Sequence, residues 1–189
     1  MNVSWVMAKP VWSRVDAWLK AQAPAVWENL APPATEESLA QLAATLGGPV
    51  PDALREAFCA HDGMVDEFGA TFFTGFRLPQ RWMGSAVWCS CRRAEEIFDR
   101  SRRVWGEYWP ERGLPIADLS RGNGYLVMRR DEAVVFFDTE DATVTPVAPS
   151  FRGWCEALLA DIEGGRVVLA DFDNEAHGAD EPGLFLLRD

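Results

Sequence analysis

The chain has 189 residues, and because a domain has about 150 on average, the length predicts one domain. Hydrophobic residues make up 48% of the sequence and charged residues 25%, a balance that excludes disordered, collagen-like and membrane-spanning classes. Acidic residues outnumber Lys and Arg by 29 to 18, and the net charge of -11 disfavours nucleic acid and anionic membranes as partners while favouring a basic protein.

Residues 1–10 lack the basic and apolar pattern of a secretory signal, so we expect the protein in the cytoplasm. The four cysteines are few for a chain that can build its own core, and we interpret them as reduced thiols. No cofactor is expected, because no cofactor-binding motif occurs in the sequence.

Three helices are predicted in the first third of the chain. The first covers about residues 13–23, where apolar residues recur at helical spacing. Thr35 is the expected N-cap of the second helix, which Gly47 ends. Asp52 begins the third, and Gly63 is the expected left-handed residue just beyond its C-terminus.

The middle of the chain has the pattern of a sheet. Short aromatic or β-branched runs bounded by turn residues predict strands at Thr71–Phe76, Ala86–Ser90, Leu114–Ala117, Tyr125–Met128, Ala133–Phe137 and Val144–Val147. A helix is predicted after the second strand, because Ala94, Ile97 and Ser101 fall on one face. Ser150 caps the clearest helix of the chain. The last four of these strands form a meander-like antiparallel block, and the order of elements is consistent with an α+β fold in which helices flank a central, mostly antiparallel sheet.

The C-terminal tail has the pattern of an acidic hairpin. Two short apolar runs, at 167–170 and 184–187, surround a loop that contains Asp171, Asp173 and Glu175. We therefore divide the chain into a domain of residues 1–165 and a C-terminal acidic hairpin extension of the same domain, residues 166–189.

The sequence offers no complete catalytic or metal-binding constellation. Cys59 and His61 lie two residues apart on one predicted helix, so they point to different faces and do not form a dyad. We interpret His61 as a partly buried residue at the helix end. Cys89 and Cys91 would share one face of a strand but lack the second ligand pair of a zinc site. An enzyme built on Cys59 or on a pair of carboxylates is therefore the least favoured hypothesis.

Several segments together resemble the SUKH superfamily, which is named partly for a fungal regulator of cell-wall assembly and contains many bacterial immunity proteins. The resemblance covers about residues 11–163. It is carried by the amphipathic helix ending at Leu30, Ala31–Leu39, Leu46–Asp52, Leu54–Gly63, Leu114–Ala117, Gly124–Tyr125 and Pro149–Phe151.

The resemblance implies a SUKH-like α+β fold and an immunity protein that neutralises a cognate toxin, often a nuclease, by covering its active site. The alternative is a regulatory scaffold that binds a host protein in a signalling or cell-envelope pathway. In either case the partner is expected to be basic, because the chain is acidic. The expected partner-binding residues are exposed acids and two tryptophan anchors near irregular segments: Asp62, Asp66, Glu67, Asp171, Asp173, Glu175, Trp82 and Trp88.

Overall fold

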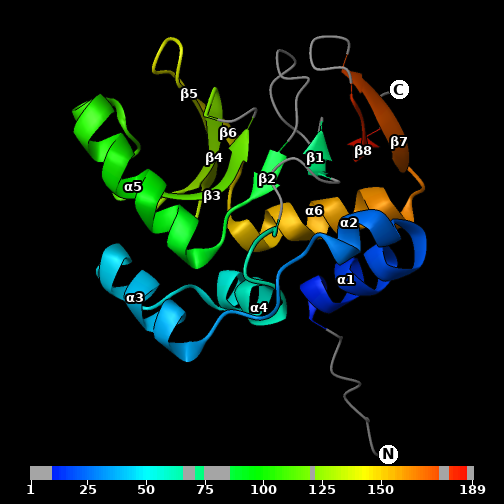
Figure 1. Cartoon of the computed structure of the whole chain (residues 1–189). Helices are drawn as coiled ribbons and strands as arrows, with labels where there is room; N and C mark the ends of the chain where they lie inside the picture. The colour runs from blue at the N-terminus through cyan, green and yellow to red at the C-terminus, as the bar shows by residue number, and fades with distance from the viewer. Residues whose placement is uncertain (1–9, 66–70, 75–85, 120–121, 175–178, 187–189) are drawn as a thin grey trace, which may run out of the picture.

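The computed structural model describes residues 10–65, 71–74, 86–119, 122–174 and 179–186 (Figure 1). A group of helices comes first in the chain, a five-stranded sheet follows, and a last helix leads into a smaller second sheet. The helices are α1 (Val11–Gln22), α2 (Pro24–Glu28), α3 (Glu36–Leu46), α4 (Asp52–Ala60), α5 (Cys91–Trp105) and α6 (Phe151–Glu163), with a 3-10 turn η1 (Gly106–Tyr108).

The helices of the first third begin and end largely as local sequence signals predict. The Thr35 hydroxyl accepts a hydrogen bond from the Ser38 amide at 3.1 Å and so caps α3. Gly47 ends this helix with a left-handed φ of 68°. Pro24 does not only interrupt the first helix; it also starts the short helix α2, because proline is favoured in the first helical turn.

The central sheet is antiparallel, with the strand order β2-β3-β4-β5-β6. Its strands are β2 (Ala86–Trp88), β3 (Leu114–Leu119), β4 (Gly124–Met128), β5 (Val134–Asp138) and β6 (Val144–Ala148). All residues of β3 and β4 are buried, so both faces of the sheet are covered by other parts of the chain. The predicted α+β class is confirmed.

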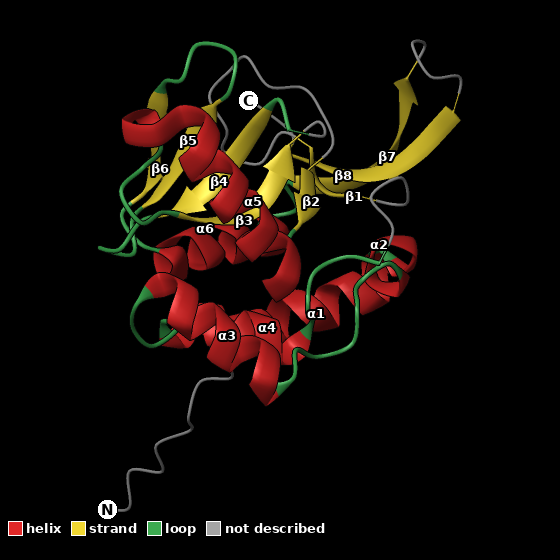
Figure 2. Ribbon diagram, turned by 60° about the vertical axis from the view of Figure 1, so that its left-hand side comes forward, coloured by secondary structure: helices red, strands yellow, loops and turns green. Residues whose placement is uncertain are grey.

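Different helices cover the two faces of this sheet (Figure 2). Tyr125 and Phe137 lie opposite each other in β4 and β5, and Phe137 contacts Trp105 of α5 with ring centroids 5.4 Å apart. Neighbouring residues on these strands point to the other face, where Trp88 packs 5.8 Å from Phe151 of α6. The core is therefore continuous through the sheet, and α6 joins the sheet to the N-terminal helices.

The tail forms part of a second, three-stranded sheet with the order β1-β8-β7. Its strands are β1 (Thr71–Thr74), β7 (Val167–Asn174) and β8 (Ala179–Leu186). β7 and β8 are antiparallel, and β8 also pairs in parallel with β1 from the middle of the chain. The tail is thus more than an added hairpin. The division of the chain at residue 165 stays a prediction.

Candidate functional site

The predicted surface acid Asp62 has a structural contact in the fold. Its carboxylate accepts a hydrogen bond from the backbone N–H of Cys91 at 2.7 Å, and Cys91 is the first residue of α5. An acid in this position satisfies one of the free amides at a helix start and interacts favourably with the helix dipole. Asp62 is half-buried, so the prediction of a freely exposed acid is wrong for this residue.

The residue after Asp62, Gly63, corrects the prediction about the end of α4. The helix α4 ends at Ala60 with His61 as an extended C-cap, so Gly63 is not the residue that terminates it. Gly63 has a positive φ of 81°. Because glycine has no Cβ, the chain can pass close to Ser90 here; an added Cβ would lie 2.4 Å from the backbone N of Ser90.

Trp88 is a core residue and not a surface anchor. Its side chain is 1% exposed and stacks on Trp12 with ring centroids 5.4 Å apart. Trp88 is directly opposite Ala117 in the sheet, so the small alanine leaves room for the indole on the covered face. The predicted anchor Trp82 lies outside the described residues, as do the predicted acids Asp66, Glu67 and Glu175.

His61 is held in a hydrogen-bonded network that joins the first helices. Its Nε2 lies 2.7 Å from Asp16 Oδ1 and its Nδ1 lies 2.9 Å from the carbonyl oxygen of Ala31. The same Asp16 oxygen accepts a hydrogen bond from the Trp27 indole at 2.9 Å. Because both ring nitrogens face protein acceptors, the imidazole positions α1, α2 and the end of α4 and has no nitrogen left for a substrate.

The cysteines do not have the surroundings of nucleophiles. Burial raises the pKa of the Cys89, Cys91 and Cys155 thiols, which keeps them protonated and unreactive. Cys59 is exposed on α4. Among the residues that the structure describes, no group of three or more His, Cys, Asp or Glu side chains is placed to bind a metal ion.

A buried acid that the sequence analysis missed fixes the turn between β3 and β4. Asp118 accepts hydrogen bonds from Arg93 of α5 at 3.1 Å and from the backbone N–H of Gly122 at 2.6 Å. Burial raises the pKa of this carboxyl, while the Arg93 hydrogen bond opposes the shift. The signal in the sequence was a single acid inside an otherwise apolar strand, and the network ties α5 to the sheet.

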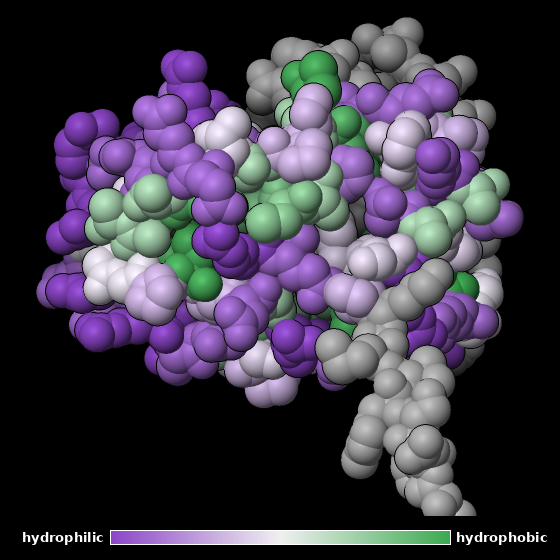
Figure 3. Space-filling view, turned by 90° about the horizontal axis from the view of Figure 1, so that it is seen from below, coloured by the Kyte–Doolittle hydropathy of each residue, from purple (hydrophilic) through white to green (hydrophobic). Residues whose placement is uncertain are grey.

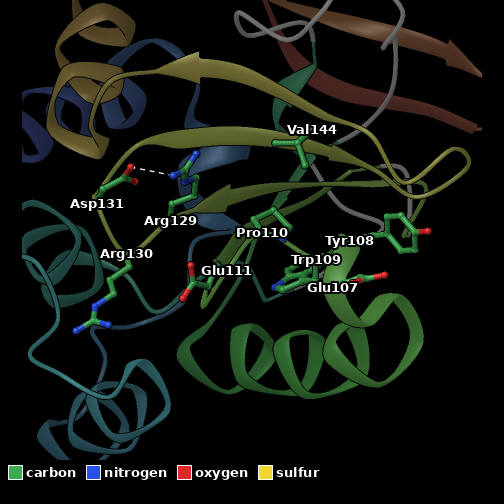
Figure 4. Close-up of a pocket in the computed structure, with 9 residues that line it drawn as sticks. All are labelled: Glu107, Tyr108, Trp109, Pro110, Glu111, Arg129, Arg130, Asp131 and Val144. Carbon is green, nitrogen blue, oxygen red and sulfur yellow. Dashed lines mark ion pairs between the residues drawn. The ribbon is translucent and has the colours of Figure 1, made fainter.

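A groove opens beside the central sheet, between η1, the β4–β5 turn and β6 (Figure 4). Its volume is about 660 Å³. Trp109 is buried, and its indole donates a hydrogen bond to the Gly113 carbonyl at 2.9 Å, whereas Tyr108 is 62% exposed and Val144 is 43% exposed. Arg129 and Asp131 form an ion pair of 3.1 Å on the opposite side. We call this site the hairpin groove.

The hairpin groove is lined by two exposed large hydrophobic side chains. The large hydrophobic residues with exposed side chains in the described part of the chain are Val65, Val104, Tyr108 and Val144. Two of the four line the groove, and Val104 precedes Tyr108 by four residues. An exposed tyrosine is a typical anchor of a protein interface, because aromatic residues carry much of the binding free energy. Sequence reasoning missed this site because its elements meet only in the fold.

The acids of the tail occupy strand positions and not the predicted loop. Asp171 and Asp173 lie in β7, because both strands of the hairpin run for eight residues. The pairing register sets Asp173 directly opposite Asp180 of β8.

The N-terminal helices form another face of the molecule. Seen from below, it is mostly hydrophilic, with smaller apolar areas between the polar side chains (Figure 3). Arg55 of α4 pairs with Glu36 of α3 at 2.8 Å. None of the helices in the described residues combines the length and the apolar character required to cross a bilayer.

Comparison with known proteins identifies the family. The sequence model of the SMI1 / KNR4 family (SUKH-1) matches residues 33–157, which is more than half of the chain. The match runs from just before α3 to the middle of α6 and includes the whole central sheet, whereas β7 and β8 lie beyond it. No curated protein matches the chain.

Proposed function

Because the chain belongs to the SMI1 / KNR4 family (SUKH-1), which includes immunity proteins, we propose that it binds a cognate toxin and neutralises it by covering the toxin's active site. The family match over residues 33–157 is the observation that carries the proposal. In this proposal the protein acts in the cytoplasm of the cell that makes the toxin, and it acts by occupancy and not by turnover.

Charge supports a basic toxin as the partner. Nucleases bind phosphate backbones through basic clefts, and a protein with a net charge of -11 is attracted to such a cleft and accelerated toward it. Electrostatic attraction of this kind raises the association rate and selects among partners more than it raises affinity. A nuclease is therefore the toxin class that we propose first.

The described groups favour binding over catalysis. The imidazole of His61 is engaged at both nitrogens, and the pKa values of three buried thiols are raised. The hairpin groove supplies an exposed aromatic anchor in Tyr108, and β7 supplies Asp171 and Asp173. These residues are our proposed contacts, together with Asp66, Glu67, Glu175 and Trp82 from the sequence analysis.

Co-expression tests the proposal. A toxin domain encoded beside this gene is expressed alone, with this protein, and with a double variant that carries Asp171→Lys and Asp173→Lys. We expect growth arrest with the toxin alone, full growth with the native protein and reduced protection with the double variant. Arrest that persists with the native protein contradicts the proposal. Stable binding to a signalling or cell-envelope protein without toxin activity would favour the regulatory scaffold instead.

A further inference from the structure

The free edges of the two sheets differ in how well they are protected against strand addition. At one edge of the central sheet, β6 contains Pro146, which has no N–H to donate, and its pairing with β5 is irregular next to Val134. At the other edge, β2 has only three residues. In the second sheet, β1 has four residues and an irregular register with β8. Proline, irregularity and short length all limit strand pairing at an edge.

The strand β7 has none of these features. It runs for eight residues, its register with β8 is continuous from Val167 to Asn174, and its sequence contains no proline or lysine. In the described part of the chain, β7 pairs with β8 alone, so alternate N–H and C=O groups along its other edge are available to an added strand.

The position of β7 leaves this edge accessible to a protein partner. Figure 2 shows β7 and β8 as a twisted ribbon that extends away from the helices. The base of the ribbon is fixed, because Val167 is 5% exposed in the core and Arg166 pairs with the buried Asp161 of α6. A partner strand would therefore add to an anchored template and not to a free tail.

The charge of β7 favours one kind of partner strand. Asp171 and Asp173 are at alternate positions of β7. A second copy of this chain paired through β7 would bring acids toward acids, whereas a segment with Lys or Arg at alternate positions would bring opposite charges together. We infer that the outer edge of β7 binds an extended basic segment of the partner as an added β-strand.

This inference rests on the proposed function in taking the partner to be a basic toxin, but the pairing is testable without the toxin. The probe is a peptide of about ten residues that alternates Lys and Val, long enough to span the strand. In two further peptides the backbone nitrogens are N-methylated, at the Lys positions in one peptide and at the Val positions in the other. Each change removes the N–H donors along one edge of the peptide and leaves its charge unchanged. A fourth peptide has Glu in place of Lys.

Binding is measured by fluorescence anisotropy, and its location by hydrogen exchange of the full-length protein. We expect the Lys peptide to bind and to slow exchange in β7, one of the two N-methylated peptides to bind about tenfold more weakly, and the Glu peptide to bind at least about tenfold more weakly. The double variant Asp171→Lys, Asp173→Lys should lose about tenfold in affinity, and the matched charge control Glu37→Lys, Glu140→Lys should stay within about twofold.

Three other outcomes overturn the inference, and a fourth overturns the proposed function alone. Equal binding of both N-methylated peptides would show electrostatic attraction without strand pairing. Protection of β7 that rises with protein concentration in the absence of peptide would show that a second copy occupies the edge. If the Lys peptide does not bind but the toxin is still neutralised, strand addition is wrong and the proposed function stands. If the peptide binds as expected but no toxin is neutralised, the proposed function is wrong and strand addition stands.

Discussion

Within the residues that the structure describes, we expect Gly63→Ala to destabilise the fold more than any other substitution of a glycine by alanine at a turn. A Cβ at this position would lie 2.4 Å from Ser90 N, 2.7 Å from Ser90 Cα and 2.8 Å from Cys89 C. All three are backbone atoms at the junction of β2 and α5, so no side chain can rotate to make room. The positive φ of 81° adds strain for any residue with a Cβ.

The magnitude follows from these two contributions. A left-handed conformation costs a non-glycine residue about 1–2 kcal/mol, and overpacking against fixed atoms costs about 1–3 kcal/mol, so we expect a total loss of about 2–5 kcal/mol. Gly165→Ala separates the backbone strain from the overpacking, because Gly165 has a φ of 67° and nothing within 4 Å of the added Cβ. Its loss should be about 1 kcal/mol. Gly48→Ala, which has neither feature, should change stability by less than about 0.5 kcal/mol.

Urea unfolding followed by tryptophan fluorescence measures these differences, because the free energy of unfolding falls linearly with denaturant. The midpoints should decrease in the order Gly48→Ala, Gly165→Ala, Gly63→Ala. If Gly63→Ala unfolds at the same urea concentration as Gly165→Ala, the close approach of Gly63 to the β2–α5 junction is refuted.

Three further predictions concern buried groups. Burial raises the pKa of the Asp118 carboxyl, so the folded state holds that proton more tightly than the unfolded chain. The native protein should therefore lose stability relative to Asp118→Asn as the pH rises through that pKa. Urea midpoints across the acid range test this change, and a gain in relative stability with rising pH contradicts it. Trp88→Ala should cost about 3–5 kcal/mol in the same unfolding assay, while Trp88→Phe should retain partner affinity, since the side chain is in the core. With a thiol reagent under native conditions, Cys59 should react rapidly and the three buried cysteines only after unfolding; fast labelling of a second thiol would refute the burial.

Local signals predicted the helices well because their boundaries are set by neighbouring residues. Thr35 caps α3 and Ser150 caps α6, where its hydroxyl accepts from the Gly153 amide at 3.0 Å. The apolar stripe of α6 is buried as its spacing predicted. The chain order of helices and strands is consistent with the α+β class that the resemblance implied, and the family match confirms the resemblance to the SUKH superfamily.

Features that depend on distant contacts could not be predicted in the same way. Pairing of β1 with β8 joins segments more than a hundred residues apart, and no local pattern encodes such a contact. Glycine commonly follows the last residue of a helix, but Gly63 is needed for the close approach of the chain to Ser90. Trp88 lies in a strand of only three residues, so its burial against Trp12 and Phe151 could not be predicted from the sequence.

The position of the candidate site could not be predicted from the sequence, and its acidic character stays a prediction. The acidic balance predicted a basic partner, and the tail acids were found as a group. Their position in a long, regular strand depends on the register of β7 with β8. The hairpin groove unites residues from η1, the β4–β5 turn and β6, which are separated in sequence and meet only when the sheet forms.

The central claim is that the protein acts by occupying its partner, and a titration of toxin activity tests it most directly. Purified toxin at a concentration well above the dissociation constant is mixed with increasing amounts of this protein, and the remaining activity is measured. The account predicts a linear loss that ends at a fixed molar ratio near one to one. Complete inactivation by a small catalytic fraction of the protein, or full toxin activity at a large excess, would contradict it.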